Sequence, residues 1–223
     1  MQPRLLAIII TLLPLFATNT VYLLSAYEGN VPWCNPYIDG CTTISQAARS
    51  GNSIYIYRAT MFAYSVLLIL FWVYIRQWLG QILHEVTKLS SSIMWLGIIG
   101  ALFLMVYIDF LGATGEINRF MRRYGIMVFF TFTPLAQILL LKLHYKSLST
   151  PASVNMKRPI LQFQLYVLLI MALIGIVSII LEVAQLKTDQ SENVVEWVFA
   201  FFLNLYFAGM IFIWRDYRYH LSE

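Results

Sequence analysis

Six separate apolar runs constrain the fold of this chain more than any other feature of its sequence. They extend over residues 5–27, 55–78, 93–111, 124–143, 160–181 and 194–214. Each is close to the roughly 20 residues that an α-helix needs to cross the hydrocarbon core of a bilayer. Each is also apolar on every face of such a helix. Residues 1–223 are therefore predicted to form one all-α integral membrane domain, a bundle of six transmembrane helices.

The first apolar run also has features of a secretory signal peptide. Arg4 precedes it, and Leu24-Ser25-Ala26 resembles a cleavage site. The run is longer than the apolar region of a signal peptide, which usually has about 7–15 residues. We therefore expect it to remain as the first transmembrane helix.

Composition supports a membrane protein and limits its partners. Hydrophobic residues make up 60% and charged residues 12% of the chain, whereas soluble domains carry roughly 25% charged residues. On a membrane protein, a net charge of +4 reflects unequal loops and contact with anionic lipid. No basic run is interleaved with exposed aromatic residues, so nucleic acid is excluded as a partner. Membrane lipids and other membrane proteins remain.

The distribution of Lys and Arg predicts the orientation. If the N-terminus is cytoplasmic, the inside set is Arg4, Arg76, Lys88, Lys142, Lys146, Lys157, Arg158, Arg215 and Arg218. The outside set is Arg49, Arg58, Arg119, Arg122, Arg123 and Lys187. Cytoplasmic loops carry the excess of positive charge, so both termini are predicted to be cytoplasmic (N-in/C-in).

The first outside loop, residues 28–54, is predicted to be a structured extracytoplasmic cap. It contains both cysteines, several aromatic residues and the turn signal Asp39-Gly40, and its apolar content argues against disorder. An oxidising location favours a disulfide between Cys34 and Cys41. The alternatives are two reduced cysteines without a role or a pair of metal ligands. No histidine lies on the outside, so no metal site is predicted.

Charged residues at the outer ends of the predicted helices are the candidate binding site, because ionisable residues in or near membrane spans are costly and by default indicate function. The predicted headgroup-binding residues are Arg58, Asp109, Arg119, Arg122, Arg123, Glu182 and Glu196. Arginine suits bidentate contacts to phosphate, and nearby acids can hold it in place. We expect Arg58 to bind phosphate, oriented by Glu182 and Glu196. Arg122 and Arg123 would attract anionic headgroups.

These charges have two other interpretations. They can form structural ion pairs or extend to the lipid headgroups. They can also serve catalysis, with Asp109, Glu182 or Glu196 as a base. The sequence contains no serine-hydrolase, phosphate-loop or dinucleotide-binding motif, and all three histidines lie at cytoplasmic helix ends. No catalytic residue and no cofactor are predicted.

Several short motifs, together with the six helices, resemble one membrane-protein superfamily. The motifs are Pro36-Tyr37-Ile38-Asp39-Gly40 in the first outside loop, Tyr55, Tyr57 and Arg58 at the start of the second helix, Glu196-Trp197 at the start of the sixth, and Asp216-Tyr217 at the end. On these residues the chain resembles the Frag/DRAM/Sfk superfamily, which includes the GPI-anchor lipid-remodelling protein of the Golgi and the damage-regulated autophagy modulators. The resemblance covers nearly the whole chain. It implies a six-helix bundle with a role in lipid handling and no firmly assigned reaction.

The chain departs from that superfamily at two places. Relatives commonly carry a Ser-Asp and a Pro-Pro-Glu-Ser-like run where this chain has residues 41–48, and many have a histidine where it has Arg122-Arg123-Tyr124. The sequence also lacks an N-x-S/T glycosylation signal, which favours a prokaryotic member acting on another lipid.

Together these features predict a multi-pass protein that binds a phospholipid or glycolipid headgroup at the outer leaflet and assists its remodelling or distribution. The cap would close over the site. The alternatives are a membrane-embedded lipid acyltransferase or hydrolase, and a membrane adaptor without ligand chemistry.

Overall fold

A computed structural model describes residues 2–148, 156–215 and 217, and these residues form helices joined by loops. The elements are α1 (Pro3–Tyr27), α2 (Ile44–Ala48), α3 (Ser53–Leu83), α4 (Lys88–Asp109), α5 (Glu116–Ser147), α6 (Arg158–Val183), α7 (Asp189–Leu205) and α8 (Ala208–Ile213). Within these described residues, six helices are long and apolar enough to cross a membrane, with α7 and α8 together forming the last. The prediction of an all-α, multi-pass membrane protein is thus confirmed. Asp216 and Arg218, which entered the sequence predictions, lie outside the described residues.

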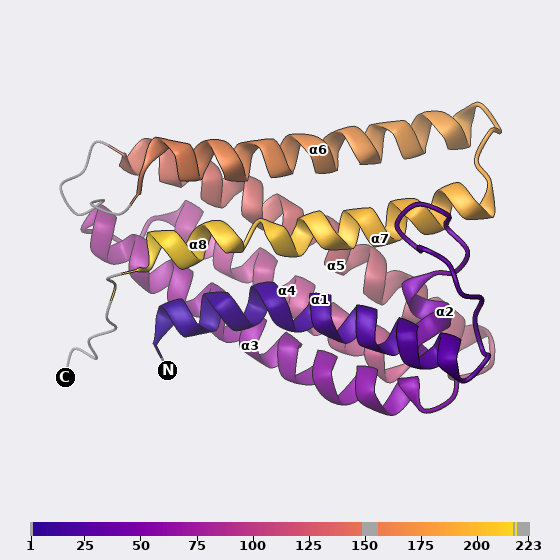
Figure 1. Ribbon diagram of the computed structural model, residues 1–223. Coiled ribbons are helices and arrows are strands. Elements are labelled where there is room, and N and C mark those ends of the chain that lie inside the picture. The colour runs from indigo at the N-terminus through magenta and orange to yellow at the C-terminus, as the bar shows by residue number, and fades with distance from the viewer. Residues whose placement is uncertain (1, 149–155, 216, 218–223) are drawn as a thin grey trace.

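The helices run along one another in a bundle with two distinct ends (Figure 1). The loop that contains α2, the α4–α5 turn and the α6–α7 turn lie at one end, and the start of α1 and the end of α8 lie at the other (Figure 1). Helix α4 packs along α3 and α5, while α1 packs on α3. We call the end that contains α2 the capped end.

Glycine allows α5 to lie very close to α4 near the capped end. A side-chain carbon on Gly125 would come within 2.9 Å of the Phe103 carbonyl oxygen and 2.8 Å of the Tyr107 nitrogen. Small residues permit such close contacts between membrane helices, whose association depends on packing and interhelical hydrogen bonds. The contact fixes the first turns of α5 beside Tyr107.

Helix α5 begins earlier than the sequence predicted. It starts at Glu116 instead of residue 124, after Gly115, whose φ of +100° favours glycine. At about 1.5 Å per residue, the 32 residues of α5 extend well beyond a hydrocarbon core of about 30 Å. Arg119, Arg122 and Arg123 therefore lie on a helix, and the predicted loop before residue 124 is shorter than expected.

Helix α6 is more deeply buried in its first half than in its second. Its buried residues run from Leu161 to Met171, and none of the described residues 172–183 is buried. In the first half, Gln164 donates a hydrogen bond to the Tyr206 carbonyl oxygen (3.4 Å). The half of α6 nearer the capped end is thus less buried, although α6 still packs against α7; the two helices run side by side from the α6–α7 turn in Figure 1.

The last span is interrupted between α7 and α8 by hydrogen bonds from neighbouring helices. Gln137 of α5 donates to the Leu203 carbonyl oxygen (2.9 Å), and Gln164 reaches that of Tyr206. Side chains that bond to helix carbonyls are a known cause of such breaks. Asn204 accepts a hydrogen bond from the Tyr64 hydroxyl (3.0 Å). Gln137 and Asn204 thus make the helix–helix hydrogen bonds that are usual for mid-membrane polar groups.

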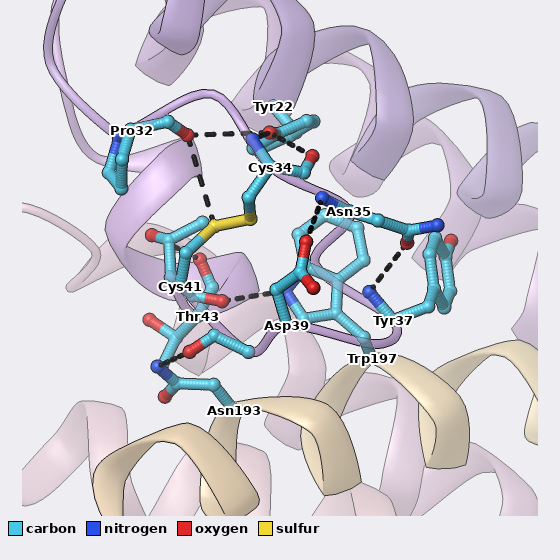
Figure 2. The surroundings of a disulfide bond; sticks show 12 residues. Tyr22, Pro32, Cys34, Asn35, Tyr37, Asp39, Cys41, Thr43, Asn193 and Trp197 are labelled. Carbon is cyan, nitrogen blue, oxygen red and sulfur yellow. Dashed lines mark hydrogen bonds between the residues drawn. A yellow bond between two sulfur atoms is a disulfide. The ribbon is translucent and has the colours of Figure 1, made fainter.

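The predicted disulfide and structured cap are both present (Figure 2). Cys34 and Cys41 are bonded, with 6.5 Å between their Cα atoms. The Tyr22 hydroxyl of α1 donates to the Cys34 carbonyl oxygen (2.6 Å) and accepts from the Cys34 amide (2.8 Å). The short helix α2 follows, with a capping box in which Thr43 and Gln46 bond each other's backbone N–H groups. The disulfide therefore holds the first half of the cap directly against α1.

Candidate functional site

A pocket of about 520 Å³ lies at the capped end, between α5, the second half of α6, α7 and α2. Its charged lining residues are Arg119, Arg122, Arg123, Lys187, Glu192 and Glu196. Its apolar lining residues are Ile126, Phe130, Val195 and Phe199. On α5 all the charged lining residues precede the apolar ones along the helix, whereas on α7 Val195 lies between Glu192 and Glu196. The pocket therefore has a mainly charged mouth at the end of the bundle and a mainly apolar interior that Glu196 also lines.

Three arginines of α5 supply most of the positive charge. Arg119, Arg122 and Arg123 occupy positions i, i+3 and i+4, which lie on one face of a helix. Within the described residues, none of the three has an acidic oxygen within 4.0 Å, since the ion pairs found there all involve Lys187. Their donor groups are available to an anion.

Lys187 forms the opposite side of the mouth and is already paired. Its amino group lies 2.9 Å from a Glu182 oxygen and 3.6 Å from a Glu192 oxygen. The hydrogen bond with Glu182 raises the pKa of Lys187 above its ordinary value, so this residue remains cationic at neutral pH. The two acids neutralise part of the charge on this side. Arginine is therefore the main free cation of the pocket.

Glu196 is held by the cap. Its carboxylate interacts with the backbone amides of Ile44 and Ser45 in the first turn of α2, and Thr43 and Ser45 line the same pocket. Negative charge at the N-terminus of a helix is favourable because the backbone N–H groups there lack partners within the helix. Glu196 thus links α7 to the cap at the pocket wall.

Two other residues of α7, Trp197 and Asn193, anchor the rest of the cap. Trp197, 1% exposed, donates from its indole nitrogen to the Thr42 carbonyl oxygen (2.9 Å). Asn193 donates to the Gly40 carbonyl oxygen (2.8 Å). The Tyr37 ring packs edge-on against Trp197, with 5.2 Å between centroids; Figure 2 shows these residues around the disulfide. The position of α2 over the pocket depends on these contacts.

A narrow cavity continues from the pocket into the bundle. Tyr107, Ile126, Phe130 and Glu196 line both spaces. The inner cavity has a volume of about 40 Å³, enough for only a few water molecules at about 10–15 Å³ each. It is too small for an acyl chain.

The structure brings together four of the seven predicted site residues: Arg119, Arg122, Arg123 and Glu196. Arg58 is not among the residues that line the pocket. It donates instead to the backbone oxygens of Asp109 (3.0 Å) and Leu111 (2.7 Å), where α4 ends. The Asp109 residue is exposed.

Of the remaining predicted residues, Glu182 lies at the edge of the pocket, bonded to Lys187. The expected grouping of Arg58 with Glu182 and Glu196 is therefore not formed. Sequence reasoning missed Glu192, Lys187 and Tyr107 as lining residues. For Lys187 a signal existed, since it was one of the few cations predicted to lie outside.

The donor set favours anion binding. Four cations and two acids line the pocket, and guanidinium groups match the geometry of phosphate and carboxylate oxygens. A scan of family models finds no match to the chain, and comparisons with curated proteins and with solved structures find none either. The functional interpretation therefore rests on these residues and their geometry.

Proposed function

We propose that this protein binds the headgroup of an anionic phospholipid or glycolipid in the pocket at the capped end and assists the remodelling or distribution of that lipid. The observation that carries the proposal is the row of three arginines beside an apolar pocket wall, which have no acidic partner in the part of the chain that the structure describes. In the N-in/C-in orientation that the Lys and Arg distribution favours, this pocket opens at the outer leaflet.

The arrangement of the pocket suits a lipid better than a soluble anion. Ile126, Phe130 and Phe199 continue the wall inward from the charges. The second half of α6 contributes Ser178 to the lining and carries exposed apolar residues, among them Ile176 and Ile180. A lipid can therefore enter laterally, with its chains against apolar residues and its headgroup beside the arginines.

The charge balance favours a phosphate over a neutral headgroup. Among the described residues, Arg119, Arg122 and Arg123 have no acidic partner. Both acids of the lining do have a partner, since Glu192 pairs with Lys187 and Glu196 faces the amides of α2. Hydrogen bonds to charged groups contribute about 1.5–3 kcal/mol each. Lipid handling is also what the sequence resemblance to the Frag/DRAM/Sfk superfamily implies, and we propose membership of that superfamily on the same basis.

The test is lipid retention by the purified protein. Native mass spectrometry compares wild type with Arg119→Ala, Arg122→Ala and Arg123→Ala, and with Arg158→Ala as the control. Arg158 is an exposed arginine at the opposite end of the bundle. We expect each pocket variant to bind dioleoyl phosphatidic acid about tenfold more weakly, the equivalent of 1.4 kcal/mol. The proposal is wrong if the three pocket variants and the control retain lipid equally.

A lipid acyltransferase or hydrolase is a second candidate, favoured by the position of Glu196. This carboxylate lies on the wall shared by the pocket and the inner cavity, beside Tyr107. It is placed where a general base would act on a water or hydroxyl group near an arginine-bound headgroup. Turnover of a radiolabelled phospholipid by wild type, and its loss in Glu196→Gln with binding intact, would identify an enzyme.

A further inference from the structure

A second, smaller pocket of about 300 Å³ adjoins the first at the start of α5. It is lined by Arg49, Arg119 and Arg122 and by the turn of residues 112–115. All three charged lining residues are cations, and no acid lines this pocket. Like its α5 neighbours, Arg49 has no acidic oxygen within 4.0 Å among the described residues. Three like charges facing one small space are unfavourable unless an anion or solvent separates them.

The α4–α5 turn brings Arg49 to this position. Arg49 follows the last residue of α2, and its Cβ lies 3.9 Å from the place where a side chain on Gly112 would begin. Gly112 has a φ of +83°, a conformation that glycine adopts without steric cost. The turn then leads through Gly115 into the N-terminus of α5, whose backbone N–H groups also favour negative charge. The cap and the start of α5 therefore contribute jointly to the smaller pocket.

Arg119 and Arg122 line both pockets. A guanidinium group carries five N–H donors in a planar fork, so one arginine can contact two separate anionic groups. Arg123 lines only the larger pocket and Arg49 only the smaller one. The two pockets therefore form adjacent halves of one cationic surface. Arg119 and Arg122 lie at their boundary, with Arg123 on one side and Arg49 on the other.

We propose that the lipid recognised by this protein carries two phosphate groups, one bound in each pocket across Arg119 and Arg122. This inference rests on the proposed function, since the larger pocket must bind a phospholipid for the smaller one to select among phospholipids. The second phosphate belongs to the same headgroup, as in a diphosphate or a bisphosphate lipid. Arg49 then determines specificity and contributes little to the binding of a lipid with one phosphate.

Arg49→Gln is the variant that tests the proposal. Protein in nanodiscs is titrated with two probes: dioleoyl phosphatidic acid, with one phosphate, and tetraoleoyl cardiolipin, with two. We expect wild type to prefer cardiolipin about tenfold or more, the effect of one additional charged hydrogen-bonding site. Arg49→Gln loses this preference and keeps the wild-type affinity for phosphatidic acid. Arg123→Ala weakens the binding of both lipids, and Arg158→Ala, the control, changes neither.

The outcomes separate the two proposals. If wild type binds phosphatidic acid in the larger pocket but shows no preference for cardiolipin, or if Arg49→Gln keeps the preference, the two-phosphate inference is overturned and the proposed function stands. If neither lipid binds above the level of Arg119→Ala, the proposed function itself fails. A calorimetric titration with inorganic pyrophosphate completes the test: binding as tight as that of cardiolipin would show that the ligand is a soluble anion and overturn the lipid assignment.

Discussion

The docking of the cap on α7 can be tested at Trp197. Its indole ring is 1% exposed and donates to the Thr42 carbonyl oxygen at 2.9 Å. Trp197→Phe keeps an aromatic ring next to Tyr22 and Tyr37, which contact the indole edge-on, and it deletes the only N–H donor of the side chain. The substitution therefore isolates one hydrogen bond between the cap and the bundle, together with a small loss of volume.

The magnitude follows from two contributions. Leaving the Thr42 carbonyl without its partner costs about 1–3 kcal/mol. The smaller ring leaves a gap that costs about 1 kcal/mol, well below the cost of a Trp→Ala change. Trp72 supplies a matched control, because it is fully buried but its indole nitrogen has no hydrogen-bond partner within the described structure. Trp72→Phe therefore loses a similar volume and no hydrogen bond.

The assay is thermal unfolding of the two variants in the same detergent. In a chain of this size each 1 kcal/mol shifts Tm by about 2–4 °C, so Trp197→Phe should melt at least about 2 °C below Trp72→Phe. The rate at which dithiothreitol reduces the disulfide of the cap is a second measurement, expected to rise only in Trp197→Phe. Equal melting temperatures and equal reduction rates in the two variants would refute the assignment of the hydrogen bond as the anchor of the cap.

Three further predictions concern the same end of the molecule. Gly40→Ala should destabilise the protein by more than about 1 kcal/mol, because Gly40 has a φ of +59° and an added carbon would clash with the Gln190 carbonyl. The control is Gly29→Ala, where φ is also positive but the space is open. The difference between the two variants in thermal unfolding measures the clash. Arg58→Ala should lower the free energy of unfolding by about 1–3 kcal/mol, because it leaves carbonyls at the end of α4 without their partner. Phospholipid binding should be unchanged in native mass spectrometry. Loss of binding in a variant that remains stable would show that Arg58 belongs to the binding site. Replacing both Cys34 and Cys41 with serine should lower Tm and weaken lipid binding together, and a Tm equal to that of wild type would show that the cap does not need the bond.

The sequence was sufficient to predict the bonded cap and the six helices, among the described residues, that are long and apolar enough to cross a membrane. Hydropathy reports where a chain can enter the hydrocarbon core, because backbone polar groups there must be satisfied within a helix. Two cysteines separated by a short turn, in a loop predicted to lie outside, similarly have few partners other than each other. These features depend on local sequence, so the structure reproduces them.

Which charges meet was decided only by the tertiary structure. Arg58 and Arg122 were expected at the same depth, but Arg58 turns to the end of α4 whereas Arg122 faces the pocket. Helices that are apolar on all faces give no periodic signal of which side faces a partner, so depth could be predicted and rotation could not. The pocket forms where α5 packs beside α7, as Phe130 does against Phe199, and where the cap docks on Trp197. Both depend on contacts between segments far apart in the chain.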